Sequence, residues 1–426
     1  MLLESHRNFR KITPINGFDE NVNNARQNNY AWSMAELGDY LYVGTARNIP
    51  DRIFNEADIP MPKAFQPSDD NGAEIWRYKK DGSSDWEKDF KAPQDSLGFR
   101  DMISYRPENK EEALYAIASS ANEEIVIYKR TKDNNWQLLN EKLPGGSSRT
   151  MVVHNNYLYI ATIPTEEFGD FPPFVFRTLD PEAGWEEVDF SDYPETRGSI
   201  YIMASYNNHL YLGFAKEGGF ELWRSKGAQI NQGWKLVIDR GAGDRANLIP
   251  FSLEEYNGYL YLGTGMVPIL GIVLGLYRTL TRGFDIIRID TDDNWRIIVG
   301  GAAAEAVRPT IGTRNRGLYP SGFGNPFNAY CWQLKKYNNI LFAGSFDWSV
   351  MIPAIIAEEI GFPINCSNFG FDLWQSNNGL RWSPITVNGF SNPYNYGARK
   401  LFPSKDNRLY LGTANPFQGC EVWVNR

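Results

Sequence analysis

A short alternating pattern of apolar residues recurs along the chain and predicts β-strands. In its commonest form it reads Leu-Tyr-Leu-Gly-Thr. Leu and Tyr in alternation, without a helical period of 3.6, are typical of a strand that packs on both faces. Recurrence of one pattern indicates an array of similar units. The seven copies are Leu41–Thr45, Leu114–Ala118, Leu158–Thr162, Leu210–Phe214, Leu260–Thr264, Leu341–Ser345 and Leu409–Thr413.

Each repeat extends to four predicted strands. An apolar segment such as Ala31–Leu37 precedes the LYLGT copy, a third segment follows it, and a turn with a Trp opens the fourth. Four short strands per repeat are typical of one propeller blade, whose faces are buried only against its neighbours. We therefore expect an all-β fold, a seven-bladed β-propeller of four-stranded blades, forming one domain over residues 1–426. The third segments are Glu74–Arg77, Phe174–Arg177, Glu221–Arg224, Asp285–Arg288, Asp372–Gln375 and Glu421–Val424.

The two ends of the sequence predict how the ring closes. The last predicted third strand, Glu421–Val424, is followed by no fourth, and Arg10–Phe18 (RKITPINGF) matches the fourth strand of the preceding repeat, Trp382–Phe390 (WSPITVNGF). We expect residues near 8–18 to pair with Glu421–Asn425, so that the N-terminal strand completes the last blade. This pairing would remove two sheet edges that otherwise promote aggregation.

Four insertions lengthen the repeats beyond the about 40–50 residues usual for propellers. Because strands alternate in direction within a blade, all four are expected on one face, where loops carry function. The alternative is a packing role. Two of them are rich in apolar residues (Met266–Leu276 and Val350–Ile356) and suit an apolar lid, a protein partner or a membrane surface. The insertions are residues 48–72, 265–283, 300–328 and 346–370.

The opposite face has short hairpins that end in Trp, such as Asp81–Trp86, Asp133–Trp136 and Ser376–Trp382. These resemble shortened Asp-boxes, the Ser-x-Asp-x-Gly-x-x-Trp turns of sialidase-like propellers. In that family the box stabilises a hairpin away from the active site. Since Asx and Gly satisfy turn geometry and Trp packs well between blades, we interpret the hairpins as structural.

Composition narrows the classes of function. The net charge of −8 and the sequence pI of about 5.2 argue against nucleic-acid binding. Met1–Arg7 lacks the apolar region of a signal peptide, and the longest uncharged apolar run, Gly265–Tyr277, is shorter than the roughly 20 residues of a membrane-spanning helix. Three scattered Cys and three His without a His-x-x-x-His pattern argue against disulfides and zinc. We expect a cytoplasmic protein without a cofactor.

Arginines and aromatic residues begin the predicted first strands, nine or ten residues before most LYLGT copies, and are expected to converge at the loop-rich face. Arg100 lies further from its copy because the hairpin there is longer. Arginine offers fixed, paired donors for carboxylate or phosphate. The alternative is a set of ion pairs between blades, such as Arg100 with Asp101. Trp348 fits no position of the repeat and is a further candidate contact. The predicted ligand-binding residues are Tyr30, Trp32, Arg100, Arg149, Trp332, Trp348, Tyr394, Tyr396 and Arg399.

A shared signature adds three candidate catalytic residues. Asn28–Trp32, Asn328–Trp332 and Asn392–Tyr396 match one another and belong to blades that are adjacent in a seven-membered ring. They place tyrosines beside Arg47 and Asp347. A phenol next to a guanidinium and a carboxylate can perform acid–base chemistry, or can form a hydrogen-bonded lining. The candidates are Arg47, Tyr330 and Asp347.

The repeats and the Arg- and Tyr-bearing face resemble the propeller of bacterial alkylating enzymes of specialised metabolism, which join alkyl halides to resorcinols or carboxylates. The resemblance implies a cofactor-independent transferase that acts on an amphipathic substrate with an acidic or phenolic head. Two alternatives remain open: a non-catalytic ligand-binding or protein-interaction scaffold, and a sialidase-like glycoside hydrolase. On the enzyme hypothesis, Arg47→Ala or Tyr330→Phe should keep the fold and abolish the response to ligand.

Overall fold

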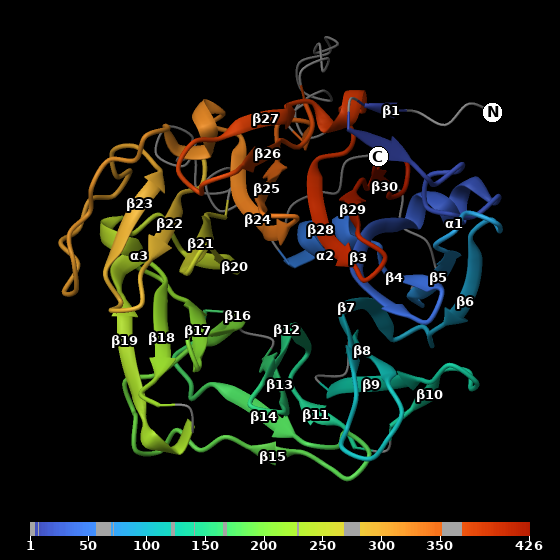
Figure 1. The fold of residues 1–426 in the computed structure, drawn as a ribbon, viewed down its shortest axis with the longest axis horizontal. Helices are drawn as coiled ribbons and strands as arrows, with labels where there is room; N and C mark the ends of the chain where they lie inside the picture. Colours follow the sequence, from blue (N-terminus) through green and yellow to red (C-terminus); the bar gives the residue numbers. More distant parts are fainter. Residues whose placement is uncertain are drawn as a thin grey trace.

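The fold is all-β, as predicted. The computed structural model describes residues 5–6, 8–56, 70, 72–120, 124–139, 141–164, 168–227, 230–267, 282–351 and 369–426. Helices in this part are short: α1 (Val22–Gln27), α2 (Ile49–Glu56), α3 (Arg240–Gly243), and the 3-10 turns η1 (Ile230–Gln232), η2 (Ser321–Gly324) and η3 (Gly389–Ser391). Strands make up most of the remaining regular structure (Figure 1).

The strands pair antiparallel with their chain neighbours in consecutive groups. The first group is β3 (Asn28–Leu37), β4 (Tyr40–Arg47), β5 (Glu74–Lys79) and β6 (Glu87–Lys91). The second is β7 (Ser96–Tyr105), β8 (Ala113–Ser120), β9 (Glu124–Arg130), β10 (Gln137–Leu138) and β11 (Leu143–Pro144). The third is β12 (Ser147–His154), β13 (Tyr157–Ile163), β14 (Phe174–Thr178) and β15 (Glu186–Glu187).

The later groups follow the same order. The fourth is β16 (Ser199–Tyr206), β17 (His209–Ala215), β18 (Glu221–Ser225) and β19 (Trp234–Ile238). The fifth is β20 (Ile249–Tyr256), β21 (Tyr259–Gly265), β22 (Ile286–Ile289) and β23 (Trp295–Val299). The sixth is β24 (Asn328–Tyr337), β25 (Ile340–Asp347), β26 (Leu373–Ser376) and β27 (Ser383–Thr386). The seventh is β28 (Gly397–Ser404), β29 (Arg408–Ala414) and β30 (Val422–Asn425).

The predicted pairing of the N-terminal segment with the last strand is confirmed. Strand β2 (Phe9–Lys11) pairs antiparallel with β30, and Phe9 lies opposite Asn425. The contact continues beyond the strand, because the Ile12 amide donates to the Val422 carbonyl at 2.8 Å. A two-residue strand, β1 (Ser5–His6), pairs with the outer edge of β2. The seventh group therefore gains its fourth strand from the other end of the chain.

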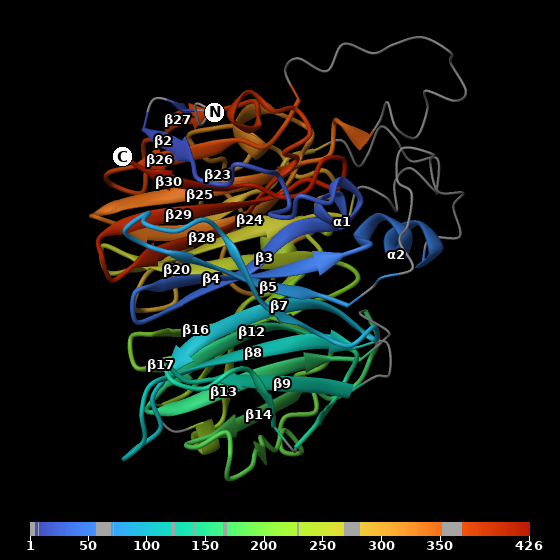
Figure 2. The ribbon, with the colours of Figure 1, turned by 90° about the vertical axis from the view of Figure 1, so that its right-hand side faces the viewer.

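The groups are arranged in a propeller-like manner. The first strand of each group lies innermost, and the later strands lie progressively further out (Figure 1). Each first strand contacts the first strand of the next group, and β28 of the seventh group contacts β3 of the first. In the perpendicular view, α1 and α2 lie at the same end of the strands (Figure 2).

The LYLGT pattern is explained by burial between neighbouring groups. Leu41 and Val43 pack towards the seventh group, whereas Tyr42 packs with Phe99 of the second. A Cβ on Gly44 would lie 2.6 Å from the Phe99 Cβ, so only glycine lets the next group approach this closely. The same holds at Gly263, where a Cβ would lie 2.7 Å from the Cys331 Cβ.

The hairpin tryptophans pack between groups, which confirms their structural interpretation. Trp86 stacks on Tyr78 at a centroid distance of 5.1 Å and donates from Nε1 to the Ile12 carbonyl of the neighbouring group at 2.9 Å. Trp136 donates to Asp89 of the first group at 2.7 Å. The turns themselves are Asx-stabilised, since Asp81 Oδ1 accepts from the Ser83 amide at 2.8 Å.

We expect Trp86→Phe to lower the free energy of unfolding by about 1–2 kcal/mol, because the Ile12 carbonyl loses its donor. The matched control is Trp185→Phe. Trp185 also opens a fourth strand, but its buried Nε1 has no hydrogen-bond partner among the described residues, so this change removes no hydrogen bond. Chemical denaturation of both variants measures the difference; equal losses would show that the hydrogen bond to Ile12 contributes nothing.

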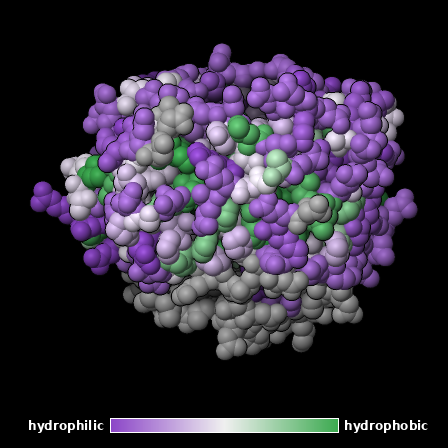
Figure 3. All heavy atoms as spheres, turned by 90° about the horizontal axis from the view of Figure 1, so that it is seen from below, coloured by the Kyte–Doolittle hydropathy of each residue, from purple (hydrophilic) through white to green (hydrophobic). Residues whose placement is uncertain are grey.

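The insertions are described only in part. Residues 300–328 lie wholly within the described chain, and they run along the outer edge of β23, where the Leu318 amide donates to the Ile298 carbonyl at 2.9 Å. The apolar segments Met266–Leu276 and Val350–Ile356 lie largely outside the described residues, so their predicted role over one face stays a prediction. One side of the molecule is mostly hydrophilic, with apolar residues in scattered spots (Figure 3).

Cys331 and Cys420 are buried free thiols, and Cys366 lies outside the described residues. Within the described part, no helix is both long and apolar enough to span a membrane.

Candidate functional site

Every first strand carries a bulge at one residue, and these residues form the candidate site. In each strand the register with its partner skips a position there, for example Trp32 between Ala31 and Ser33. Strands β3, β7 and β24 also skip a second position nearer their start, at Asn29, Leu97 and Ala329. A bulge leaves the extra residue out of the ladder and re-aims its side chain. We call the set the bulge ring: Trp32, Arg100, Arg149, Tyr201, Phe251, Trp332 and Arg399.

Ring contacts join most members of the bulge ring to one another. The guanidinium of Arg399 lies over the rings of Trp332 and Trp32, with distances of 5.0 and 5.9 Å to their centroids. On the other side of Trp32, the Arg100 guanidinium lies 4.9 Å from the same ring. Arg149 lies 3.9 Å over Tyr201. The three arginines therefore occupy one arc of the ring, interrupted only by Trp32.

The remaining arc is aromatic. Tyr201 packs edge-on against Phe251 at 6.1 Å, and Phe251 stacks on Tyr330 at 4.2 Å. Tyr330 in turn stacks on Phe346 at 4.6 Å and contacts Trp332 at 5.7 Å. The site thus has a cationic arc and an apolar arc, a division that suits a ligand with an acidic head and an apolar body.

Two predicted tyrosines lie behind this ring. The Tyr30 and Tyr396 hydroxyls are hydrogen-bonded to each other, and both rings are buried. Tyr30 also packs edge-on against Trp332 at 5.8 Å. Burial raises the pKa of Tyr30 to about 12 and that of Tyr396 well above its ordinary value. Both phenols therefore stay protonated at neutral pH, and in the bond between them one hydroxyl donates and the other accepts.

Arg399 is the most unusual member of the bulge ring. It is 9% exposed, and among the described residues it forms no hydrogen bond or ion pair; its Nε is a buried donor without a partner. Burial, reinforced by the charge of Arg149, lowers the pKa of Arg399 to about 9. A buried cation held only against two indoles is costly in isolation, and an anionic ligand would relieve that cost.

Asp101, the alternative ion-pair partner predicted for Arg100, has other partners in the structure. Asp101 accepts from Lys400 Nζ at 3.0 Å and from the Met151 amide at 2.8 Å. Arg100 instead donates to the Ser147 hydroxyl. The nearest carboxylate in sequence is thus paired with another cation.

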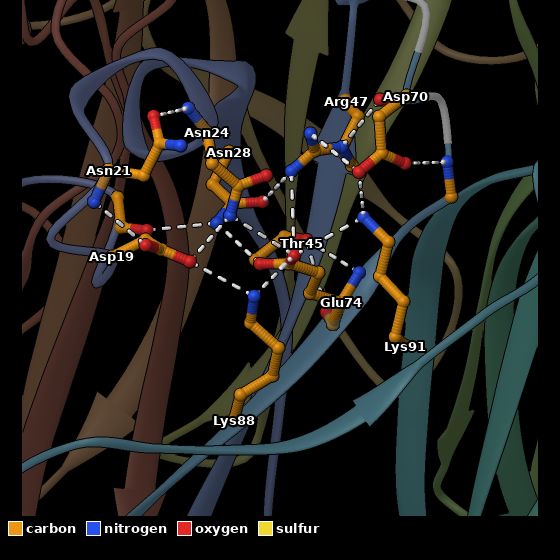
Figure 4. A network of polar contacts seen from close by, with 12 residues as sticks. Asp19, Asn21, Asn24, Asn28, Thr45, Arg47, Asp70, Glu74, Lys88 and Lys91 are labelled. Carbon is orange, nitrogen blue, oxygen red and sulfur yellow. Dashed lines mark hydrogen bonds and ion pairs between the residues drawn. The ribbon is translucent and has the colours of Figure 1, made fainter.

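Arg47 lies in a different environment, a buried polar network inside the first group (Figure 4). Its side chain is 0% exposed; it donates to Asn28 Oδ1 at 3.0 Å and lies 3.7 Å from Glu74 Oε1. Lys88 and Lys91 bind the same oxygen of Glu74 at 3.0 and 3.3 Å. Its contacts are those of a structural ion pair, and its catalytic role stays a prediction.

The other predicted residues are more dispersed. Asp347 is buried and accepts from Asn325 Nδ2 at 2.7 Å and from the Ser349 amide at 2.8 Å. Trp348 is buried edge-on against Phe327 at 5.3 Å, in a small cluster against which Tyr330 and Phe346 of the aromatic arc also pack. Tyr394 is 37% exposed and packs on Phe417.

The alignment of Asn392 with Asn28 was wrong. Asn28 donates from Nδ2 to the acid of its own group, Glu74, at 2.9 Å. In the seventh group the buried asparagine that donates in the same way is Asn395, whose Nδ2 lies 2.6 Å from Glu421 Oε2. The turn before β28 is therefore three residues longer than the shared signature suggests.

Three members of the aromatic arc were not among the predicted site residues: Tyr201, Phe251 and Phe346. Tyr201 and Phe251 share the position about nine residues before an LYLGT copy with Trp32 and Arg149. That spacing was a sufficient signal. A separate pocket of about 530 Å³ lies at the third group, lined by residues that include Pro172, Phe190 and Tyr193. Its one arginine, Arg197, pairs with Asp170 at 2.5 Å.

Comparison with known proteins adds little about function. Neither protein-family models nor curated proteins give a match to this chain. Among solved structures, a prolyl endopeptidase superposes with a TM-score of 0.41 and 10% identity over 90% of this chain and 46% of its own. The Pyrococcus horikoshii acylaminoacyl peptidase gives 0.47 and 7% over 93% and 52%.

A putative 6-phosphogluconolactonase from Bacteroides uniformis gives a TM-score of 0.46 and 10% identity over 81% of this chain and 85% of its own. The chain spans about half the length of the two peptidases. At such low scores and identities we take no functional argument from these likenesses.

Proposed function

We propose that the protein is a seven-bladed propeller that binds a small amphipathic molecule at the bulge ring, with its acidic or phenolic head on the arginine arc. The blade number is supported by the consecutive strand groups and by the contact of β28 with β3. A bulge in every first strand, with its residue in the bulge ring, supports a common axis.

The observation that carries the ligand class is Arg399. Its guanidinium lies over Trp32 and Trp332, it forms no ion pair in the described part of the chain, and the charge of Asp101 acts on it only from a distance. Arg100 and Arg149 lie on the same arc and add donors in fixed planes, which suit a carboxylate or phosphate. The aromatic arc offers an apolar surface for an alkyl or aromatic body.

We further propose that the bound molecule is a substrate and that no redox cofactor takes part. Tyr330, a member of the aromatic arc that is stacked between Phe251 and Phe346, is the proposed hydrogen-bond donor to a reacting group. Alkylation is the reaction to assay first. A ligand-binding scaffold without catalysis is the alternative. A sialidase-like hydrolase has no support beyond the Asp-box-like turns and the arginines, and the cytoplasmic location stays a prediction.

Thermal unfolding in the presence of matched ligands tests this proposal. An alkyl carboxylate and the alcohol of the same chain length share a body and differ in the head. At about 100 times its dissociation constant, a ligand adds roughly 2.7 kcal/mol to stability. We expect the carboxylate to stabilise the protein and the alcohol and a sialoside to leave it unchanged. Equal shifts of the melting temperature with the carboxylate and the alcohol would contradict a site that recognises the negative charge. No shift with any of these ligands would favour the non-catalytic scaffold.

A further inference from the structure

A buried polar motif repeats in four of the strand groups. In each, an asparagine at the start of the first strand donates from Nδ2 to a carboxylate at the start of the third-strand segment and to a glycine carbonyl. The pairs are Asn28 with Glu74, Asn247 with Asp285, Asn328 with Asp372, and Asn395 with Glu421, at 2.9, 3.0, 2.8 and 2.6 Å. The hydroxyl that ends the LYLGT pattern accepts from the amide of the same acidic residue in all four.

The two oxygens of the carboxylate have different partners. In the first group, Glu74 Oε2 accepts from Asn28 and Trp76, and Oε1 binds Lys88, Lys91 and Arg47. The seventh group is alike: Glu421 Oε2 accepts from Asn395 and Trp423, while Oε1 binds Lys11 at 3.2 Å. In the fifth group, Arg282 and Arg314 neutralise Asp285 at Oδ2, which also accepts from Asn247, and Oδ1 accepts from the Ser321 hydroxyl. Each of these three carboxylates therefore has a cation from the protein.

The sixth group keeps the motif but lacks the cation. Asp372 Oδ2 accepts from Asn328 at 2.8 Å and from Trp374 at 3.2 Å, as its counterparts do. Its Oδ1 is buried and has no hydrogen-bond partner among the described residues. Asp372 is 3% exposed, and no lysine or arginine of the described chain forms an ion pair with it. Residues 352–368, which enter this group between β25 and β26, contain no Lys or Arg either.

A second acid stands where the first group has its arginine. Asp347 lies opposite Asn328 in the register of β24 and β25, as Arg47 lies opposite Asn28 in β3 and β4. Arg47 donates to Asn28 Oδ1 at 3.0 Å, and Arg282 and Asn415 donate to the equivalent oxygens of Asn247 and Asn395. The Oδ1 of Asn328, a residue that is 0% exposed, has no such donor in the described structure.

We propose that the sixth group binds a divalent metal ion of the calcium or magnesium type, with Asp347, Asp372 Oδ1 and Asn328 Oδ1 as ligands. Carboxylate and amide oxygens are the ligands that these hard cations prefer, and water completes their coordination. The metal would occupy the place that the Arg47 guanidinium occupies in the first group. No cluster of three or more His, Cys, Asp or Glu occurs in the described chain, so this site depends on the amide oxygen as its third ligand.

The expectation of no metal was drawn from histidine spacing and concerned zinc. A site of two carboxylates and one amide belongs to a different class of metal site, and the spacing of histidines cannot detect it. Phe346 contacts Tyr330 and Trp332, and Asp347 is the next residue, so the metal would fix the end of β25 beside the aromatic arc. The proposal is independent of which ligand the bulge ring takes.

Terbium luminescence tests the proposal. Tb³⁺ replaces Ca²⁺ at oxygen sites and emits when a nearby tryptophan is excited; Trp374 donates to Asp372 and is adjacent to the site. On the purified full chain after chelation, we expect saturable emission that Ca²⁺ displaces. Asp372→Asn and Asp347→Asn should each weaken Tb³⁺ binding at least about tenfold. The matched control, Glu221→Gln, alters the acid of the fourth group, which pairs with Lys216 and Trp223, and should keep the full signal.

The variants must also be shown to fold, so that a loss of emission can be assigned to the metal site. Thermal unfolding in chelator establishes that the variants fold, and asparagine can still accept the hydrogen bonds from Asn328 and Trp374. Absence of saturable emission in the wild type, or equal emission in the wild type and both variants, would overturn the proposal. So would a melting temperature that responds to acid but not to Ca²⁺, because the site would then hold a proton in place of a metal.

Discussion

Arg399→Met is expected to weaken binding of an alkyl carboxylate by about 100-fold, since a hydrogen bond or ion pair to a charged group contributes about 1.5–3 kcal/mol. The same change should raise the free energy of unfolding in the absence of ligand by about 0.5–2 kcal/mol. Methionine fills similar space against Trp32 and Trp332 without the cost of a buried charge that lacks an anion. Calorimetric titration and denaturant unfolding measure the two effects.

The matched control for this experiment is Arg288→Met. Arg288 lies 4.0 Å over the Tyr259 ring, so it makes the same kind of contact, but it belongs to a third strand and not to the bulge ring. It should leave ligand affinity unchanged. If Arg399→Met destabilises the protein and leaves affinity intact, Arg399 is a structural residue and the bulge ring is not the binding site.

Glu74→Gln is expected to lower the free energy of unfolding by about 3–5 kcal/mol at neutral pH, because removal of one partner leaves buried charge uncompensated. Arg47 is 0% exposed, and Lys88 and Lys91 share the same carboxylate oxygen. The control Glu221→Gln, whose carboxylate is 20% exposed and therefore less buried than that of Glu74, should cost less. In the double variant Arg47→Met/Glu74→Gln, part of the loss should return, and a double-mutant cycle by denaturant unfolding measures the coupling.

The pH dependence gives the same test a second readout. Burial opposes ionisation of Glu74, but hydrogen bonds from Asn28 and Lys88 and the charge of Arg47 outweigh it, so the pKa of Glu74 is lower than its ordinary value of 4.5. Such a group stabilises the fold above its unfolded pKa, and this stability is lost as pH falls through the folded pKa. Glu74→Gln should therefore flatten the acid limb of the stability curve. An Arg47→Ala variant that folds as stably as wild type and loses ligand binding would contradict the structural role and support the predicted catalytic role of Arg47.

The sequence was sufficient for the strand groups and for the pairing of β2 with β30, because both depend on local patterns that repeat. The LYLGT pattern indicates a strand buried between neighbouring groups. The match between Arg10–Phe18 and Trp382–Phe390 indicates that the N-terminal segment is the missing fourth strand of the last group. The spacing of nine residues also found five of the seven positions of the bulge ring; Arg399 lies 10 and Arg100 lies 14 residues before its LYLGT copy. The bulges themselves leave no residue signature, since the re-aimed side chain is Trp, Arg, Tyr or Phe in different groups.

The residues of the site were harder to predict, because the direction of each side chain determines whether it reaches the site. Arg47 and Tyr30 are close in the sequence of the hairpin, but alternation along β4 turns Arg47 into the polar interior of the first group, whereas Tyr30 faces Tyr396. Asp347 follows Phe346 and is turned away from Tyr330 for the same reason. Only the asparagines of the asparagine–carboxylate motif, Asn28 and Asn328, could be recognised in the sequence. Their acidic partners lie 46 and 44 residues away along the chain, so the sequence does not show that they pair.

Binding of an acidic head at the arginine arc is tested most directly by a crystal structure of the complex with a brominated alkyl carboxylate. We expect carboxylate density within hydrogen-bond distance of Arg399 and of Arg100 or Arg149. The anomalous signal of bromine should lie on the side of Phe251 and Tyr330. Ligand density at the pocket of Pro172 and Tyr193, with the bulge ring unoccupied in the same crystal, would contradict this binding mode.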